Sequence, residues 1–400
     1  MTNEADVVAL GRVGFQLNAV VRGAIFNPGR PEGLRFNTGS PNHLSFTLKP
    51  SERDPHGFGY SGLNYRVRAE LPASAATIEF VRALIAGRYE PFGDPPLPLP
   101  LTLNDRTVIA ADGTIQEGFG LRHELAPLEV RQLLDLAEAD LEGARDRFLS
   151  LLRWRQGAVA ADKLVEYSSL YWRVDPGVYH IVPQRLSQPT TGRTTGKGFR
   201  WGDNHEAALS ELWNRNVEEP FAHELIREAQ TLLEQSPRSA LLIAVSAAET
   251  GIKQHLSKVA PATAWLLEEG PSPPVDKMLR KYVPVVNAAA GRDVDFWDAL
   301  KPIFSAVKCM VEARNKVAHT GRLPDGTDVQ AAIDSVRDLL YVLDVVEGES
   351  WAKLLVDESL ANQLDWPPRE KIDRRVLLRM SQPDDEALRD MLTRSGKTRD

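Results

Sequence analysis

The most constraining feature of this sequence is a succession of helical apolar patterns between residues 205 and 350. Five stretches carry apolar residues at positions i, i+3 or i+4, and i+7, the spacing of one face of an α-helix. Their stripes begin at Phe221, Leu241, Met278, Phe304 and Val329. Short breaks rich in glycine and proline separate them. The sequence therefore predicts an antiparallel helical bundle over residues 204–350.

Residues 1–185 show a different pattern, with short β-branched or alternating runs between turn-forming residues. We expect strands at 19–26, 43–48, 63–71, 167–174 and 177–183, a hairpin at 106–115, a short helix at 76–85 and a long helix at 127–155. The predicted fold class is thus α+β: a mixed strand and helix domain, followed by the all-α bundle.

Two further segments complete the predicted organisation. Residues 186–203 are rich in glycine, threonine and basic residues, which is typical of a linker. Residues 351–400 carry many charges and two short helical patterns, and we interpret them as a charged, partly helical tail.

Charge and composition limit the partners of the chain. The net charge is −7 over 400 residues, and residues 201–350, with 15 Lys and Arg against 23 Asp and Glu, carry −8. A protein that coats nucleic acid is normally basic, so any nucleic acid must be held locally. The sequence has no apolar run of about 18 residues and no basic start typical of a secretory signal. With Cys309 as its single cysteine, we expect a cytoplasmic protein without a membrane partner.

Common catalytic and metal-binding motifs are absent from the sequence. Residues 191–198 lack the spacing and the final Ser or Thr of a phosphate-binding loop. None of the three His-Glu pairs is followed by the second histidine of a zinc protease. The eight histidines show no metal-ligand spacing. We therefore expect neither a metal site nor a cofactor.

One stretch, Val311-Glu-Ala-Arg-Asn-Lys-Val-Ala-His-Thr-Gly, stands out at the end of the fourth helical pattern. At about 100° per residue, Glu312, Asn315 and His319 share a face of the helix. Arg314 falls instead on the apolar stripe, where an unpaired charge is costly. Glu249 lies on the apolar run of the second helix, so we expect an ion pair between Glu249 and Arg314.

A purely structural interpretation is also open. Asn315 and His319 lie near a helix end, where such side chains commonly cap backbone carbonyl groups. An ion pair between Glu249 and Arg314 can serve stability alone. Spacing by itself does not separate this interpretation from a catalytic one.

The segment Arg314-Asn-Lys-Val-Ala-His319 resembles the Arg-x(4–6)-His motif of the HEPN superfamily, including its common Arg-Asn-x-x-x-His form. The stretch Ala240-Leu-Leu-Ile-Ala-Val-Ser-Ala-Ala-Glu249 is similar to the early HEPN helix, with its acidic residue inside an apolar face. The resemblance covers about residues 205–350. It implies an HEPN-like helical bundle, and it says nothing about residues 1–185.

What the resemblance implies is a metal-independent endoribonuclease that acts as a homodimer through the helical bundle. The implied catalytic residues are Arg314, Asn315 and His319, with Glu249 and Glu312 in supporting roles. Basic residues expected to contact RNA are Lys316, Arg322, Arg193, Lys197 and Arg200. HEPN ribonucleases occur in toxin–antitoxin and antiphage defence systems, so an antitoxin or a trigger protein is a further expected partner.

Two alternatives remain open at this point. The first is a non-catalytic HEPN module that binds a nucleotide or a partner protein. The second is a scaffold in which the bundle only dimerises and residues 1–185 carry the function.

Overall fold

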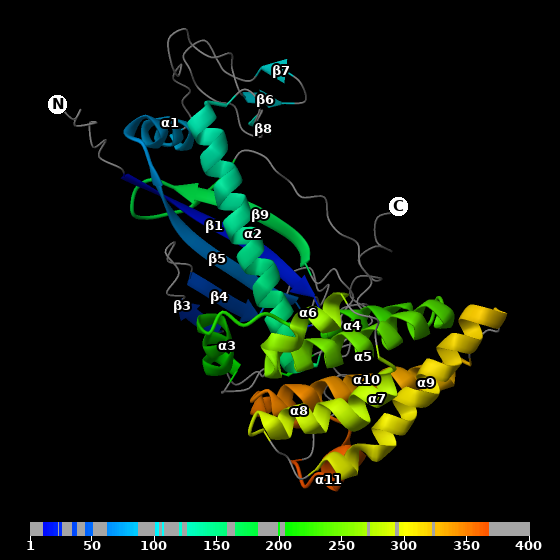
Figure 1. Cartoon of the computed structure of the whole chain (residues 1–400). Coiled ribbons are helices and arrows are strands. Elements are labelled where there is room, and N and C mark those ends of the chain that lie inside the picture. Colours follow the sequence, from blue (N-terminus) through cyan, green and yellow to red (C-terminus); the bar gives the residue numbers. More distant parts are fainter. Residues whose placement is uncertain are drawn as a thin grey trace, which may run out of the picture.

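The structure of the chain is a computed structural model in which a strand-rich half precedes a helical half (Figure 1). It describes residues 11–22, 24–25, 34–37, 45–50, 62–86, 101–103, 106–107, 120–121, 126–157, 165–182, 199–200, 205–269, 273–292, 296–321 and 325–367. The α+β fold class predicted from the sequence is confirmed.

Six strands form one antiparallel sheet with the order β10-β9-β1-β5-β4-β3. These strands are β1 (Gly11–Arg22), β3 (Leu34–Asn37), β4 (Ser45–Pro50), β5 (Gly62–Ala73), β9 (Val165–Arg173) and β10 (His180–Ile181). Each strand predicted at 19–26, 43–48, 63–71, 167–174 or 177–183 overlaps one of them. In the register of β1, Gln16 lies opposite Arg68 of β5 and Tyr171 of β9.

Short strands make up the rest of the described β structure. A three-stranded sheet joins β6 (Leu101–Leu103), β7 (Arg106–Thr107) and β8 (Gly120–Leu121), and β2 (Ala24–Ile25) pairs in parallel with β11 (Phe199–Arg200). Most of the predicted hairpin at 106–115 and most of the predicted linker at 186–203 lie outside the described residues.

Alternate residues of the central strands build the core of the sheet half. The odd-numbered residues of β1 from Val13 to Ala19 and of β5 from Val67 to Ala73 are buried. Side chains alternate across a strand, so these residues all point to the same side of the sheet. Helices α1 (Ala75–Ile85) and α2 (Leu128–Gln156) contact the sheet and cover this side.

Helix α2 joins the two halves of the molecule. It has 29 residues and is therefore about 44 Å long, and in Figure 1 it runs from α1 along the sheet to the helices of the second half. It ends at Gly157, whose φ of 59° is the left-handed conformation that favours glycine. Near this end Trp154 is 2% exposed and packs edge-on against Trp351. The α2 terminus is thus part of the helical core.

The helical half contains all five helices that the periodicity predicts. They correspond to α4 (Phe221–Leu232), α5 (Pro237–Val259), the run α7–η3–α8 (Val275–Lys277, Met278–Tyr282, Val283–Ala289), α9 (Lys301–Thr320) and α10 (Gly326–Val346). Helix α5 packs against α4, α9 and α10. Among the described residues, no helix combines the length and apolarity needed to cross a membrane.

Several short elements were not expected from the sequence. They are α3 (His205–Asn214), η2 (Pro261–Thr263), α6 (Ala264–Glu269), η4 (Trp297–Leu300), η5 (Ser350–Leu354) and α11 (Glu358–Gln363). The last two lie almost entirely within the predicted tail, which begins at residue 351. Ala352, Val356 and Leu360 are buried there, and η5 contacts α10, because these apolar residues extend the helical core. The predicted tail helices lie outside the described residues.

Two glycines in helices offer a matched test of the packing. A Cβ atom at Gly251 in α5 would lie 2.2 Å from Cδ2 of Leu340, whereas nothing lies within 4 Å of a Cβ atom at Gly143 in α2. We expect Gly251→Ala to lower the free energy of unfolding by about 1–3 kcal/mol through overpacking. Gly143→Ala should raise it by about 0.5–1 kcal/mol by restricting the unfolded chain. Urea unfolding of both variants checks this, and shifts of the same sign would contradict the packing of α5 on α10.

Candidate functional site

The Arg-Asn-x-x-x-His segment lies in the last two turns of α9, which runs along the outer edge of the helical half (Figure 1). The helix is anchored by a buried face, which consists of Ile303, Phe304, Val307, Met310 and Val317. It ends at Gly321, whose φ of 68° is left-handed and whose N–H donates to the carbonyl of Val317. The segment is therefore held on a well-anchored helix.

Within the segment, burial differs from residue to residue. Arg314 follows Met310 by four residues and precedes Val317 by three, so it continues the buried face and is half-buried itself. Asn315 and His319, four residues apart, share an exposed face, and Lys316 is exposed as well. The predicted faces of Arg314, Asn315 and His319 are thus confirmed.

The predicted partner of Arg314 is wrong. Glu249 forms an ion pair with Lys253 at 3.0 Å, and among the described residues no ion pair joins it to Arg314. Lys253 follows Glu249 by four residues on α5, so both side chains lie on the same helix face and meet without crossing to another element. Glu249 therefore does not hold the Arg314 side chain in place.

The remaining predicted residues are placed only in part. Glu312 lies 3.8 Å from Lys308 in an exposed pair on α9, a geometry that contributes little to stability. Arg322, Arg193 and Lys197 lie outside the described residues. Arg200 belongs to β11, and its side chain is not described.

The helix geometry separates Arg314 from His319. Five residues along an α-helix correspond to a rotation of about 140° between their side-chain directions. One side chain therefore continues the core-facing stripe, while the other faces away from the bundle.

A groove of about 860 Å³ runs between α9 and α10. Its floor is mostly apolar, and its lining includes Leu241, Met310, Val317, Val329 and Ala332, with Glu312, Lys316 and Asp328 among its polar residues. On α9 the apolar lining residues Met310 and Val317 lie on a different side of the helix from His319, whereas Glu312 lies on the same face as His319. The groove is large enough for a small ligand or a segment of another protein.

Sequence reasoning missed the best-connected polar groups of the helical half. His223 is 2% exposed, and its Nε2 lies 2.9 Å from Oδ2 of Asp344, a charge contact that is not aligned as a hydrogen bond. Trp154 of α2 donates its Nε1–H to the same carboxylate at 2.8 Å. Burial raises the pKa of Asp344, and His223 and Trp154 partly oppose this rise.

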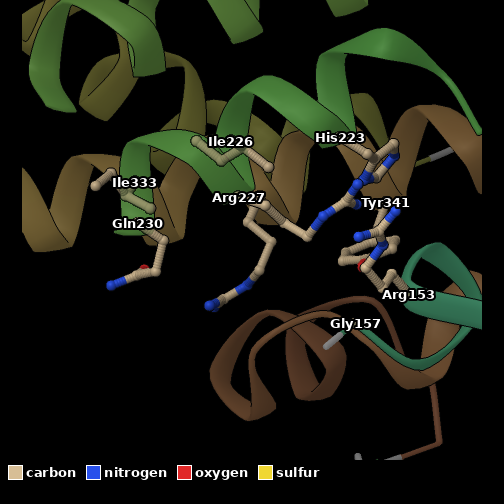
Figure 2. A pocket seen from close by; sticks show the side chains of 9 residues that line it. Arg153, Gly157, His223, Ile226, Arg227, Gln230, Ile333 and Tyr341 are labelled. Atoms are coloured by element: carbon tan, nitrogen blue, oxygen red, sulfur yellow. The ribbon is translucent and has the colours of Figure 1, made fainter. Parts of the chain in front are cut away.

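The cavity beside this cluster is small. It measures about 20 Å³ and is lined from α2, α4 and α10, as Figure 2 shows for Arg153, His223 and Tyr341. This volume accommodates about one water molecule. The cluster is therefore too enclosed to reach a macromolecular substrate and serves to join α2 to the bundle.

A second buried group surrounds His255, which is 1% exposed. Its Nδ1 lies 3.0 Å from Glu347, and its Nε2 lies 2.9 Å from the side-chain amide of Asn287. That amide also donates to the carbonyl of Val283, so it donates to Nε2 of His255 as well, and Nδ1 of His255 faces the Glu347 carboxylate. Burial acts to raise the pKa of Glu347, but His255 and Lys258 outweigh it and the pKa is lowered.

Both clusters could have been suspected from the sequence, because His255 and Asp344 lie at core-facing positions of strongly periodic helices. Among the described residues, no group of three or more His, Cys, Asp or Glu side chains is placed to hold a metal ion. Comparisons with protein-family models, curated proteins and solved structures found no match to this chain.

Proposed function

We propose that this chain is a metal-independent endoribonuclease of HEPN type that acts as a homodimer. The observation that carries the proposal is the position of the Arg-Asn-x-x-x-His segment on α9. Asn315 and His319 are exposed together, and Arg314 is half-buried on the adjoining core-facing stripe. Residues of catalytic type on the exposed side of a helix whose other side is buried are both accessible to substrate and rigidly positioned.

The proposed reaction uses the 2′-hydroxyl of RNA as the nucleophile. An imidazole such as that of His319 can take or give a proton near neutral pH. The Arg314 guanidinium stabilises negative charge on the phosphate oxygens, and Asn315 orients the phosphate. The 2′-oxygen attacks the adjacent phosphorus, and the 5′-oxygen leaves with a proton. The products are a 2′,3′-cyclic phosphate and a 5′-hydroxyl end, and the route needs no metal. A toxin or antiphage role follows only from the HEPN resemblance.

A specific observation favours a second candidate function. Arg314 and His319 point in different directions, while the α9–α10 groove offers about 860 Å³ of mostly apolar space. A non-catalytic module that binds a nucleotide or a partner protein in this groove accounts for both features. A purely dimerising bundle that serves the sheet half is the third possibility.

The experiment that tests the proposal is an RNA cleavage assay in excess EDTA. Wild type is expected to cleave single-stranded RNA and leave cyclic phosphate ends. His319→Ala should reduce the rate by at least about 100-fold, because it removes the proton-transferring group. His180→Ala is the matched control, since His180 is exposed on β10, far along the chain from α9. Equal cleavage by wild type and His319→Ala contradicts the mechanism, and no cleavage by wild type favours the binding module.

A further inference from the structure

The sheet has a second face, which is polar. Because side chains alternate along a strand, the even-numbered residues of β1 and β5 and the odd-numbered residues of β9 point away from α1 and α2. Around Gln16 and Asn18, this face carries four arginines, Arg12, Arg66, Arg68 and Arg173. The described helices that contact the central strands, α1 and α2, lie on the opposite side.

The positive charge of this face is largely uncompensated. Its one described acidic side chain, Glu70, bonds Arg173 at 2.8 Å across Gly14, which has no Cβ to block the contact. Arg66 and Arg68 have no carboxylate partner among the described residues. They donate instead to the amide oxygens of Asn18 and Gln16, at 3.2 and 2.7 Å.

The two unpaired arginines lie on neighbouring outward positions of β5 and repel each other. The pKa of Arg66 is lowered, first by burial and next by the charge of Arg68. An anion bound between them would relieve their mutual repulsion, because it brings opposite charge to both guanidinium groups. The face is therefore electrostatically prepared for phosphate groups.

The ring of Tyr179 packs against two arginines of this face. The guanidinium carbon of Arg68 lies 5.1 Å from the ring centre of Tyr179, and that of Arg173 lies 4.8 Å from the same ring. Tyr171 is half-buried beside Gln16 in the register of β9. A pleated surface of tyrosine rings and guanidinium planes can stack unpaired bases, while the guanidinium N–H groups bond phosphates.

We propose that this face of the sheet, centred on Arg66, Arg68 and Tyr171, is a binding surface for single-stranded RNA. It supplies the local positive charge that residues 201–350, at −8, do not have. An acidic protein segment would use the arginines alone, whereas single-stranded RNA would bond the arginines through its phosphates and stack its bases on the tyrosine rings. RNA binding at the sheet does not involve α9 and is independent of the proposed ribonuclease. Only the role of the bound RNA as a substrate rests on that proposed function.

The test measures binding separately from cleavage. Full-length protein carrying His319→Ala is titrated, by fluorescence anisotropy, into a labelled single-stranded RNA of about 12 nucleotides. Arg66→Glu with Arg68→Glu should weaken binding at least about tenfold, because two phosphate contacts become repulsive. The milder pair Arg66→Gln with Arg68→Gln should lower the slope of log affinity against log salt by about 1.4. Thermal melting monitors the fold of each variant.

Three controls establish that RNA binds at this surface and that it binds as a single strand. Arg238→Glu changes an exposed charge near the start of α5, in the helical half, and should alter affinity less than about twofold. An RNA duplex of the same length should bind more weakly, because its bases are stacked and paired. Unchanged RNA affinity in both β5 double variants would overturn the proposal, and so would equal affinity for the duplex. Equal competition by a glutamate-rich peptide would reassign the face to an acidic protein partner.

The binding and cleavage results can fail independently. If RNA binding depends on Arg66 and Arg68 but wild type does not cleave RNA, the RNA-binding surface on the sheet is supported and the ribonuclease proposal is contradicted. If cleavage depends on His319 but the β5 variants bind RNA with unchanged affinity, the ribonuclease proposal is supported and the RNA-binding surface on the sheet is contradicted.

Discussion

A mixture of two inactive variants, Arg314→Ala and His319→Ala, is expected to regain about one quarter of the wild-type cleavage sites after subunit exchange. The reason is the rotation of about 140° between the two side chains on α9. A shared site then takes its arginine from one copy and its histidine from the other. Half of the exchanged dimers are mixed, and each mixed dimer contains one intact site of its two. Cleavage of a labelled RNA before and after exchange measures the recovery.

The reverse mixture provides the control. When wild type exchanges with a chain carrying both substitutions, each site of the mixed dimer lacks one of the two groups, so mixed dimers should be inactive. If each copy instead builds its own site, dimers of wild type with the double variant keep one active site of their two. The mixture of Arg314→Ala and His319→Ala then regains no cleavage. That pattern would contradict the shared site while leaving the ribonuclease itself in place.

The second large effect is expected at Asp344. Asp344→Ala should lower the free energy of unfolding by about 3–5 kcal/mol, because it removes the acceptor of the buried Trp154 Nε1–H and the charge contact with the buried His223. Both partners are almost fully enclosed, at 2% exposure each, so water cannot replace the lost carboxylate. Chemical denaturation followed by tryptophan fluorescence measures the change, and a loss below about 1 kcal/mol would contradict the role assigned to this cluster.

Asp344→Asn is the matched variant. The amide keeps an oxygen that can accept from Trp154 Nε1, so the loss should be much smaller than with alanine. Burial raises the pKa of Asp344 in the folded state, and its contribution to stability is therefore present at low pH and lost as the pH rises. The amide does not titrate, so the stability of Asp344→Asn relative to wild type should increase with pH. A constant difference would show that Asp344 does not change its pKa on folding.

Much of the fold could be predicted because its signals are local. The apolar stripe of α9 recurs every three or four residues from Ile303 to Val317, and this spacing alone predicts the helix and places Arg314 on its buried side. The strand predicted at 63–71 similarly coincides with most of β5, whose odd-numbered residues from Val67 to Ala73 are buried. In both elements, the burial pattern follows from residues that are close neighbours in the chain.

The errors concern choices between distant partners. Glu249 and Arg314 are compatible in charge and burial. Lys253, however, lies one helical turn from Glu249 on the same helix, and the ion pair forms between these two residues instead. The sequence also gives no sign that Val356 and Leu360 belong to the helical core, because their segment is short and flanked by charges. Such outcomes depend on tertiary packing, which periodicity does not encode.

The path of α2 has a consequence for how the halves of this protein can be studied. The helix starts over the sheet and ends with Trp154 inside the other half, where Asp344, His223 and Trp351 surround it. A fragment that stops at residue 185 keeps this tryptophan but loses every one of these neighbours. Its exposed indole and the apolar turns around it favour aggregation, whatever the sheet does in the intact chain. Dissection by truncation would thus report on solubility, and single substitutions in the full-length chain are the sound way to assign activity to either half.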